Sequence, residues 1–318
     1  MRVIRIGSRG SALARWQSDH IAARLAAAVP GVRFAVVEIS STGDQVADVP
    51  LSHLEGTGFF TATIERALLD GEVDVAVHSY KDLPVVSTAG LEVGAVPTRG
   101  PVEDVLCARD GMTLQTLPPG ARLGTCSARR TAQVKAARPD LDVRSLRGNV
   151  PTRVGRVTSG ELDAIVLARA GLMRLGLEAH ITEVFSIEQV LPAPAQGALA
   201  VQCRAGDGAI LSLLSRLDDA ETRGAVDAER TLLHALGGGC SVPVGALATY
   251  RDRLLTLDAG VFGIAPAIAV RVREEGEDPT TVGEAAARRL LDAGAGGILA
   301  EFNKTARLNP PTLSGDIS

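Results

Sequence analysis

Hydrophobic residues recur along the chain in short runs that alternate with stretches of helical periodicity. The first run, residues 2–7, predicts a strand, and residues 11–29 predict an amphipathic helix with a serine at its start. A second strand at 32–40, a helix at 61–71 and a buried strand at 73–77 complete a βαβαβ order. This order is typical of an α/β domain built on a parallel sheet.

A second α/β series begins at about residue 103, and a smaller α+β series begins at about residue 218. Pro- and Gly-rich stretches at 94–104 and 190–201 stand where the chain would cross between the first two series and return. The turn-rich segment 41–60 is longer than an ordinary connection, and we expect it to be a functional flap.

The chain is long enough for more than one hydrophobic core, since it has 318 residues. We therefore predict two α/β domains around a cleft and a smaller α+β domain, with ligands at the carboxyl ends of the strands. Domain 1 comprises residues 1–98 and 198–217, domain 2 residues 103–192, domain 3 residues 218–305, and residues 306–318 form a C-terminal tail.

The composition is that of a globular protein, with 46% hydrophobic and 22% charged residues and a net charge of -4. An acidic balance and an aromatic content of only 3% argue against nucleic acid as a partner. The start of the chain has no apolar signal region, and no stretch approaches 18 uninterrupted apolar residues. We expect a cytoplasmic protein that has no membrane partner.

The four cysteines have no spacing typical of a zinc site or a disulfide framework, so we predict no metal. Cys107 and Cys203 lie in strand-like runs and are expected in the core. Cys240 instead follows three glycines in "LGGGCSVPVG". Because glycines remove side-chain cover, this thiol is expected to be presented to a ligand.

The buried strand at 73–77 runs directly into His78, Ser79, Lys81 and Asp82. An acid beside a lysine at a strand end suits proton transfer. An ordinary solvated Lys–Asp turn explains the pattern equally well. His78 has no partner visible in the sequence, and we expect it to be structural.

A local excess of seven positive charges lies between Arg122 and Arg156, where eight arginines and one lysine face two aspartates. Several of these arginines stand at the starts of predicted helices, where anions bind favourably. No phosphate-binding glycine motif accompanies them, so a ligand with several carboxylates is favoured over a phosphate. The excess lies within one folded domain, which also fits nucleic acid poorly.

Seven segments resemble, in order and at similar spacing, motifs of the hydroxymethylbilane synthase family, also called porphobilinogen deaminase. The resemblance covers nearly the whole chain and is weakest after about residue 250. It implies a monomeric, three-domain transferase whose first two domains resemble type II periplasmic binding proteins. The segments are RIGSRGSALARWQ, AVHSYKDLP, GTCSARR, SLRGNVPTR, LDAIVLARAGLMRLG, LPAPAQGALAVQCR and GGGCSVPVG.

The resemblance implies a reaction and a cofactor. In that family the cysteine of the GGC loop, here Cys240, forms a thioether to a dipyrromethane. Four porphobilinogen units are added to this primer with loss of ammonia, and water releases hydroxymethylbilane for porphyrin and haem biosynthesis. The acetate and propionate groups of cofactor and product match the predicted polycarboxylate ligand.

The same resemblance assigns roles to individual positions. Asp82 corresponds to the catalytic aspartate. Cofactor-carboxylate contacts are implied for Ser79, Lys81, Ser127, Arg129, Arg130 and Arg147, and contacts to substrate or the growing chain for Arg9, Ser11, Arg153 and Arg174.

Four positions depart from the family pattern: Thr57 in the flap, Glu103 in the crossing segment, Cys126 before a helix, and Gln202. They replace a lysine, an arginine, a serine and a glutamate, respectively. These departures keep open an alternative function, a slow or non-polymerising paralogue that binds a pyrrole polycarboxylate in the same cleft. A non-enzymatic solute binder or transcriptional regulator is a further class, but neither has a use for Cys240.

Overall fold

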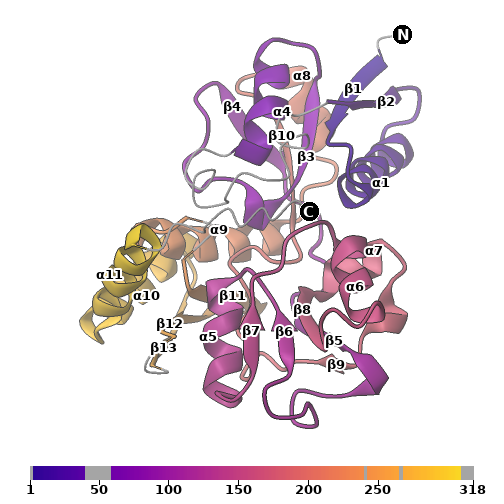
Figure 1. The fold of residues 1–318 in the computed structure, drawn as a ribbon. Coiled ribbons are helices and arrows are strands. Elements are labelled where there is room, and N and C mark those ends of the chain that lie inside the picture. Colours follow the sequence, from indigo (N-terminus) through magenta and orange to yellow (C-terminus); the bar gives the residue numbers. More distant parts are fainter. Residues whose placement is uncertain (1–2, 40–58, 240–241, 265–267, 309–318) are drawn as a thin grey trace.

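The computed structural model describes residues 3–39, 59–239, 242–264 and 268–308 (Figure 1). Two five-stranded mixed sheets and one three-stranded antiparallel sheet organise these residues. Residues 41–58 of the predicted flap, including Thr57, lie outside the described residues. Cys240 also lies outside them.

The first sheet has the order β2-β1-β3-β10-β4. Strands β1, β2 and β3 are parallel, whereas β10 is antiparallel to β3 and β4. Helices α1 and α8 pack on one face and α4 on the other. The elements are β1 (Val3–Ser8), α1 (Ala12–Ala28), β2 (Arg33–Glu38), α4 (Phe59–Leu69), β3 (Val75–Ser79), β4 (Leu91–Ala95), β10 (Leu199–Arg204) and α8 (Gly208–Leu214).

The second sheet repeats this topology in the order β7-β6-β8-β5-β9, with β5 antiparallel to its neighbours. In the first sheet the antiparallel strand β10 follows the crossing from the second sheet. In the second sheet the antiparallel strand β5 follows the crossing from the first sheet. The elements are β5 (Asp104–Ala108), β6 (Arg122–Gly124), α5 (Ala128–Ala137), β7 (Asp142–Arg144), α6 (Val150–Thr158), β8 (Ala164–Ala168), α7 (Arg169–Arg174) and β9 (Glu183–Val184). The predicted α/β class, with two mixed sheets and a smaller α+β part, is confirmed.

The third sheet is antiparallel and packs on helices through one apolar core. Its middle strand alternates, so that Leu255, Leu257 and Ala259 are buried against the helices. Helix α9 crosses the centre of the molecule, beneath the first sheet and beside the other two (Figure 1). The elements are α9 (Ala220–Ala235), β11 (Val244–Arg251), β12 (Leu254–Phe262), β13 (Ala269–Gly276), α10 (Pro279–Asp292) and α11 (Ala295–Leu308).

The two crossing segments run side by side between the first two sheets. The amide of Gly100 donates to the carbonyl of Gly197 at 3.2 Å. Gly197 has a φ of +85°, and a Cβ there would lie 2.6 Å from the Gly100 oxygen. Only glycine fits this approach, so the crossings are held in close contact.

A buried ion pair fastens the crossings to α9. The Glu229 side chain is fully buried and accepts from both terminal nitrogens of Arg99, at 2.7 and 2.9 Å. It also accepts from the backbone amides of Ala195, at 2.6 Å, and Ala248, at 2.8 Å. One carboxylate therefore joins both crossing segments to α9 and to β11.

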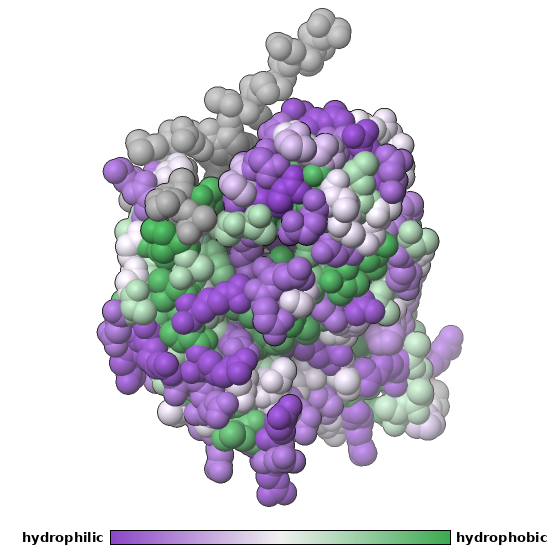
Figure 2. Space-filling view, turned by 90° about the horizontal axis from the view of Figure 1, so that it is seen from below, coloured by the Kyte–Doolittle hydropathy of each residue, from purple (hydrophilic) through white to green (hydrophobic). Residues whose placement is uncertain are grey.

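Most of the predicted elements are present, and both Cys107 and Cys203 lie in the core as expected, at 2% and 0% exposure. The pattern missed β9, which has only two residues, as well as β4, α8 and α11. In the view from below, hydrophilic and hydrophobic residues are interspersed over the surface (Figure 2). Within the described part of the chain, no helix is both long and apolar enough to span a bilayer.

Candidate active site

The end of β3 passes directly into a short 3-10 helix, η1 (Tyr80–Asp82), which carries Lys81 and Asp82. Tyr80 is buried, Lys81 is half-buried and the Asp82 side chain is exposed. Arg230 of α9 holds this turn by donating to the carbonyls of Leu83, at 3.0 Å, and Pro84, at 2.6 Å. Its guanidinium also lies 4.4 Å from the centre of the Tyr80 ring. The exposed carboxylate of Asp82 thus lies on a turn whose backbone is hydrogen-bonded to α9.

A continuous polar chain leads from this turn into the second sheet. Lys81 Nζ donates to Gln196 Oε1 at 3.3 Å, and Gln196 Nε2 donates to Asp104 Oδ1 at 3.0 Å. The fully buried Asp104 carboxylate also accepts from Arg129 Nη1 at 2.7 Å and from Arg130 Nη2 at 2.6 Å. The structure therefore connects Lys81 with Arg129 and Arg130 across the two crossing segments.

The electrostatics of this chain depend on the balance between burial and charge. Burial alone would raise the pKa of Asp104, but attraction to Arg129 and Arg130 outweighs it and holds the pKa well below its usual range. At Lys81, loss of hydration lowers the pKa to about 8, although the neighbouring Asp82 opposes this shift. Lys81 is therefore a cation whose charge responds to its surroundings near physiological pH.

The predicted serines lie at ends of strands and at starts of helices. Ser11 caps α1 by accepting from the amide of Ala14, and Ser127 caps α5 by accepting from the amide of Arg130, at 3.3 and 3.4 Å. Ser79, at the end of β3, accepts from Gln17 Nε2 at 2.7 Å. These hydroxyls fix the local backbone and stand where helix amino ends attract anions.

Of the remaining predicted arginines, Arg9 and Arg147 follow strands, whereas Arg153 lies in α6 and Arg174 ends α7. Arg9 is half-buried after β1, and Arg147 is half-buried after β7. Arg153 Nε donates to the carbonyl of Gly148 at 2.7 Å. Arg174 Nη2 donates to the carbonyl of Gly197 at 2.7 Å, and burial lowers its pKa to about 10. Arg174 is thus hydrogen-bonded to a crossing segment. Arg147 lies between β7 and α6, and Arg153 lies in α6.

Two of the linking residues were missed by the sequence analysis. Gln196 bridges Lys81 and Asp104, and Arg230 fixes the turn that carries Asp82. A glutamine carries no distinctive chemistry, and Arg230 belongs to a helix whose charged residues look like a solvated face. Only the position of Gln196, in the Pro- and Gly-rich crossing segment, offered a signal.

Three of the departures from the family pattern lie within the described residues, each in a different environment. Glu103 pairs with Arg169 Nη1 at 3.0 Å, so the reversed charge in the crossing segment has a cationic partner. Gln202 is fully hydrogen-bonded in the first sheet. Cys126 is exposed ahead of α5.

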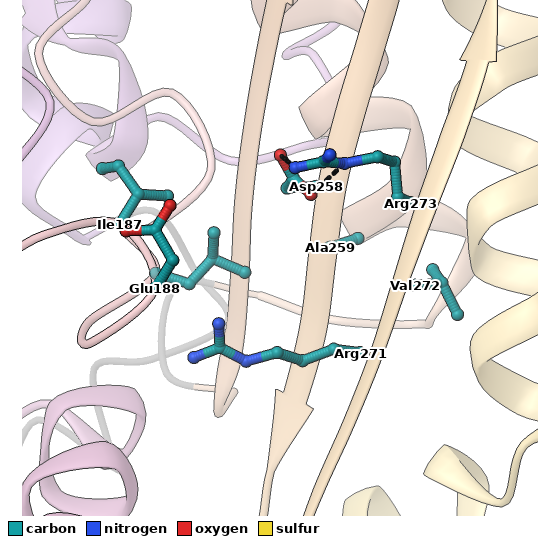
Figure 3. A pocket seen from close by; sticks show the side chains of 8 residues that line it. Ile187, Glu188, Asp258, Ala259, Arg271, Val272 and Arg273 are labelled. Carbon is teal, nitrogen blue, oxygen red and sulfur yellow. Dashed lines mark hydrogen bonds and ion pairs between the residues drawn. The ribbon is translucent and has the colours of Figure 1, made fainter.

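Two hollows lie away from this region, between the second and third sheets. Figure 3 shows the one lined by Asp258, Arg271 and Arg273. Arg273 is committed to Asp258 through two hydrogen bonds of 2.8 and 2.9 Å. Arg271 reaches across to Gln133 of α5 at 3.2 Å. The polar groups here mainly join two parts of the fold, and these hollows are not the candidate active site.

The donor set suits a ligand with several carboxylates. Lysine, arginine and serine groups follow strands of both sheets, and a buried aspartate pairs with two of the arginines and orients them. Fold and site together define an α/β protein with two five-stranded mixed sheets and a set of basic and hydroxyl side chains near the ends of their strands.

Comparison with known proteins identifies the family. Residues 4–212 match the family model described as "Porphobilinogen deaminase, dipyromethane cofactor binding domain", and residues 224–292 match "Porphobilinogen deaminase, C-terminal domain". The porphobilinogen deaminase of Desulforudis audaxviator is 48% identical over 96% of this chain and 99% of its own length. That of Mycolicibacterium gilvum is 54% identical over 77% of this chain and 78% of its own length.

A solved lipoprotein of the YaeC family from Enterococcus faecalis is also similar, with 14% identity, a TM-score of 0.41, and coverage of 70% of this chain and 93% of that one. The chain belongs to the porphobilinogen deaminase family. It is a transferase of tetrapyrrole biosynthesis and carries the family's dipyrromethane cofactor-binding domain. The resemblance predicted from the seven sequence segments is confirmed.

Proposed function

We propose that this chain carries out the family's reaction through Asp82 and Cys240. Four porphobilinogen molecules condense head to tail onto a dipyrromethane held by the Cys240 sulfur, each losing ammonia, and hydrolysis releases hydroxymethylbilane. The observation that carries this proposal is the Lys81–Asp82 turn, where an exposed carboxylate adjoins a buried basic network. The proposal places the enzyme in the cytoplasm as a monomer without nucleic-acid or membrane partners.

Asp82 performs the central chemical task. When bound, dipyrromethane supplies the free pyrrole end to which substrate units are added. Asp82 stabilises the positive charge that develops on the substrate pyrrole as ammonia leaves, and it accepts the proton lost when the ring regains aromaticity. Arg230 supports both tasks because it keeps the backbone of the turn in place.

The basic and hydroxyl groups orient the carboxylates. Lys81, near Gln196 and the Asp104 network, is the central cation in this proposal. Arg129 and Arg130 have a structural role through Asp104 in addition to their proposed ligand contacts. The proposed cofactor contacts are Ser79, Lys81, Ser127, Arg129, Arg130 and Arg147, and the proposed substrate contacts are Arg9, Ser11, Arg153 and Arg174.

The proposed domain limits follow the two crossings. Domain 1 takes residues 1–98 and 198–217, domain 2 residues 103–192, and domain 3 residues 218–305. These limits are supported by the strand order, because β10 lies in the first sheet although it follows the second sheet's strands in the sequence.

The intact mass of the denatured, reduced protein tests the function. We expect a mass excess equal to one dipyrromethane, and its complete loss in Cys240→Ser, because only that thiol is proposed to form the thioether. Cys126→Ser is the matched control: Cys126 is exposed but should leave the excess unchanged. An unmodified wild-type mass after incubation with porphobilinogen would refute the proposal, and so would an excess that follows Cys126.

Cofactor loading should depend on pH through Lys81. The lysine is charged below about pH 8 and neutral above it, and a bound carboxylate favours the charged form. Loading of the unmodified protein by preformed hydroxymethylbilane should therefore weaken as the pH rises through about 8. In Lys81→Arg, whose charge persists, the loaded fraction measured by intact mass should stay level. An equal decline in wild type and Lys81→Arg would assign the effect to another group.

A further inference from the structure

A buried chain of three side chains runs behind the candidate active site. His78 Nε2 lies 3.1 Å from Gln202 Oε1, and Gln202 Nε2 donates to Glu65 Oε1 at 2.9 Å. The exposed fractions of these residues are 6%, 1% and 6%, respectively. The other Glu65 oxygen accepts from Thr88, at 3.0 Å, and Thr61, at 3.5 Å. These hydrogen-bonded side chains join α4, β10 and β3 just before the turn that carries Asp82.

The chemistry of this chain determines which way the Gln202 amide faces. The amide nitrogen must point to Glu65, because the opposite orientation would set an amide oxygen against a carboxylate. The amide oxygen then faces His78 and can only accept a hydrogen bond. The proton of the imidazole must therefore be on Nε2, which leaves Nδ1 as the acceptor.

The charged groups around His78 come from three further elements. Glu65 lies on α4, Arg9 follows β1, and Asp82 belongs to the turn after β3; all three interact electrostatically with the imidazole. Burial is the largest influence and lowers the pKa of His78 to about 4, although Glu65, Gln202 and Asp82 oppose the shift and Arg9 adds to it. The imidazole is therefore neutral at physiological pH.

We propose that Gln202 is a positioning residue that holds the buried, neutral His78 ring as the Nε2–H tautomer beside Arg9 and Asp82, without adding a charge of its own. A neutral imidazole adds no positive charge next to the place where the substrate pyrrole becomes cationic. Asp82 then faces that developing charge without a competing cation at His78. This inference rests on the proposed catalytic role of Asp82.

The uncharged amide is what distinguishes Gln202 from the glutamate typical of the family motif. A carboxylate at this position would lie against Glu65 in a buried site, where two neighbouring negative charges favour uptake of a proton. The imidazole is the basic group within reach to take it. With glutamate at this position, the added negative charge would raise the pKa of His78 from its value of about 4 and favour the imidazolium.

The test is Gln202→Glu in the cofactor-loaded enzyme, with histidine labelled by ¹⁵N and ¹³C for NMR. In wild type we expect the His78 ring to be neutral and protonated on Nε2 from about pH 6 to about pH 9. In Gln202→Glu we expect its titration to move upward by more than about one pH unit, and the pH profile of kcat to gain an ionisation at the same position. His78→Asn in the Gln202→Glu background should remove that new ionisation.

A His78 ring protonated on Nδ1 in wild type would overturn the proposal, and so would an unchanged His78 titration in Gln202→Glu. Because the wild-type tautomer is measured directly, the proposal remains testable if the variant does not fold. A wild-type enzyme that does not turn over porphobilinogen would instead refute the proposed function. The NMR measurement would still decide the state of His78.

Discussion

Asp82→Asn is expected to lower kcat by about 10²- to 10⁴-fold while the protein still folds and retains its cofactor. Asparagine has nearly the same shape, but it neither accepts the pyrrole proton nor stabilises a developing cation with a full negative charge. The Asp82 side chain is exposed, so its replacement leaves no buried group unpaired. Steady-state release of hydroxymethylbilane at saturating porphobilinogen measures the effect.

Two controls separate chemistry from loading in this experiment. The intact mass of Asp82→Asn should show the same dipyrromethane excess as wild type, since the proposed attachment is at Cys240. Asp82→Glu keeps the charge and should recover part of the lost kcat. A kcat of Asp82→Asn close to wild type, with the cofactor in place, would remove Asp82 from the mechanism.

The α/β class of the first two sheets was predictable because short apolar strands alternate with helices, as β1 with α1 and β6 with α5. The connection between them could be placed from Pro and Gly residues in the two crossings. The antiparallel insertion of β5 and β10 depends on which strands meet in space, and periodicity carries no information about strand direction. The two-residue β9 is too short to form a pattern at all.

The candidate site was predictable where its residues lie together in the sequence. Lys81 and Asp82 follow a buried strand, which is a local signal. His78 was expected to be structural because its partner, Gln202, is 124 positions away and becomes its neighbour only through the pairing of β3 with β10. The link from Lys81 through Gln196 to Asp104 likewise spans the crossings and has no local signature.

Helix α9 connects the parts of this site that the chain order separates. Glu229 holds the crossing segments, and the next residue, Arg230, holds the turn that carries Asp82. The helix ends at Ala235, five positions before Cys240. A change in the position of α9 would therefore alter the crossing segments and the turn that carries Asp82 together.

Glu229→Ala should consequently lower the free energy of unfolding by about 3–5 kcal/mol. The substitution leaves the Arg99 guanidinium, whose side chain is only 11% exposed, without its counter-ion. It also removes the acceptor for the buried amides of Ala195 and Ala248. Urea unfolding followed by circular dichroism measures the change in the cofactor-loaded protein.

The matched control is Asp19→Ala, which removes the exposed ion pair with Arg15, whose side chains are 51% and 54% exposed for Arg15 and Asp19, respectively. Its expected cost is below about 1 kcal/mol, because water replaces the partner of each charge. If both substitutions cost the same, the Arg99–Glu229 pair does not fasten the crossings. The double substitution Arg99→Leu with Glu229→Leu tests the cause of this loss. If it recovers much of the lost stability, the loss in Glu229→Ala comes from an unpaired buried charge. The ion pair then specifies how α9 meets the crossing segments more than it adds stability.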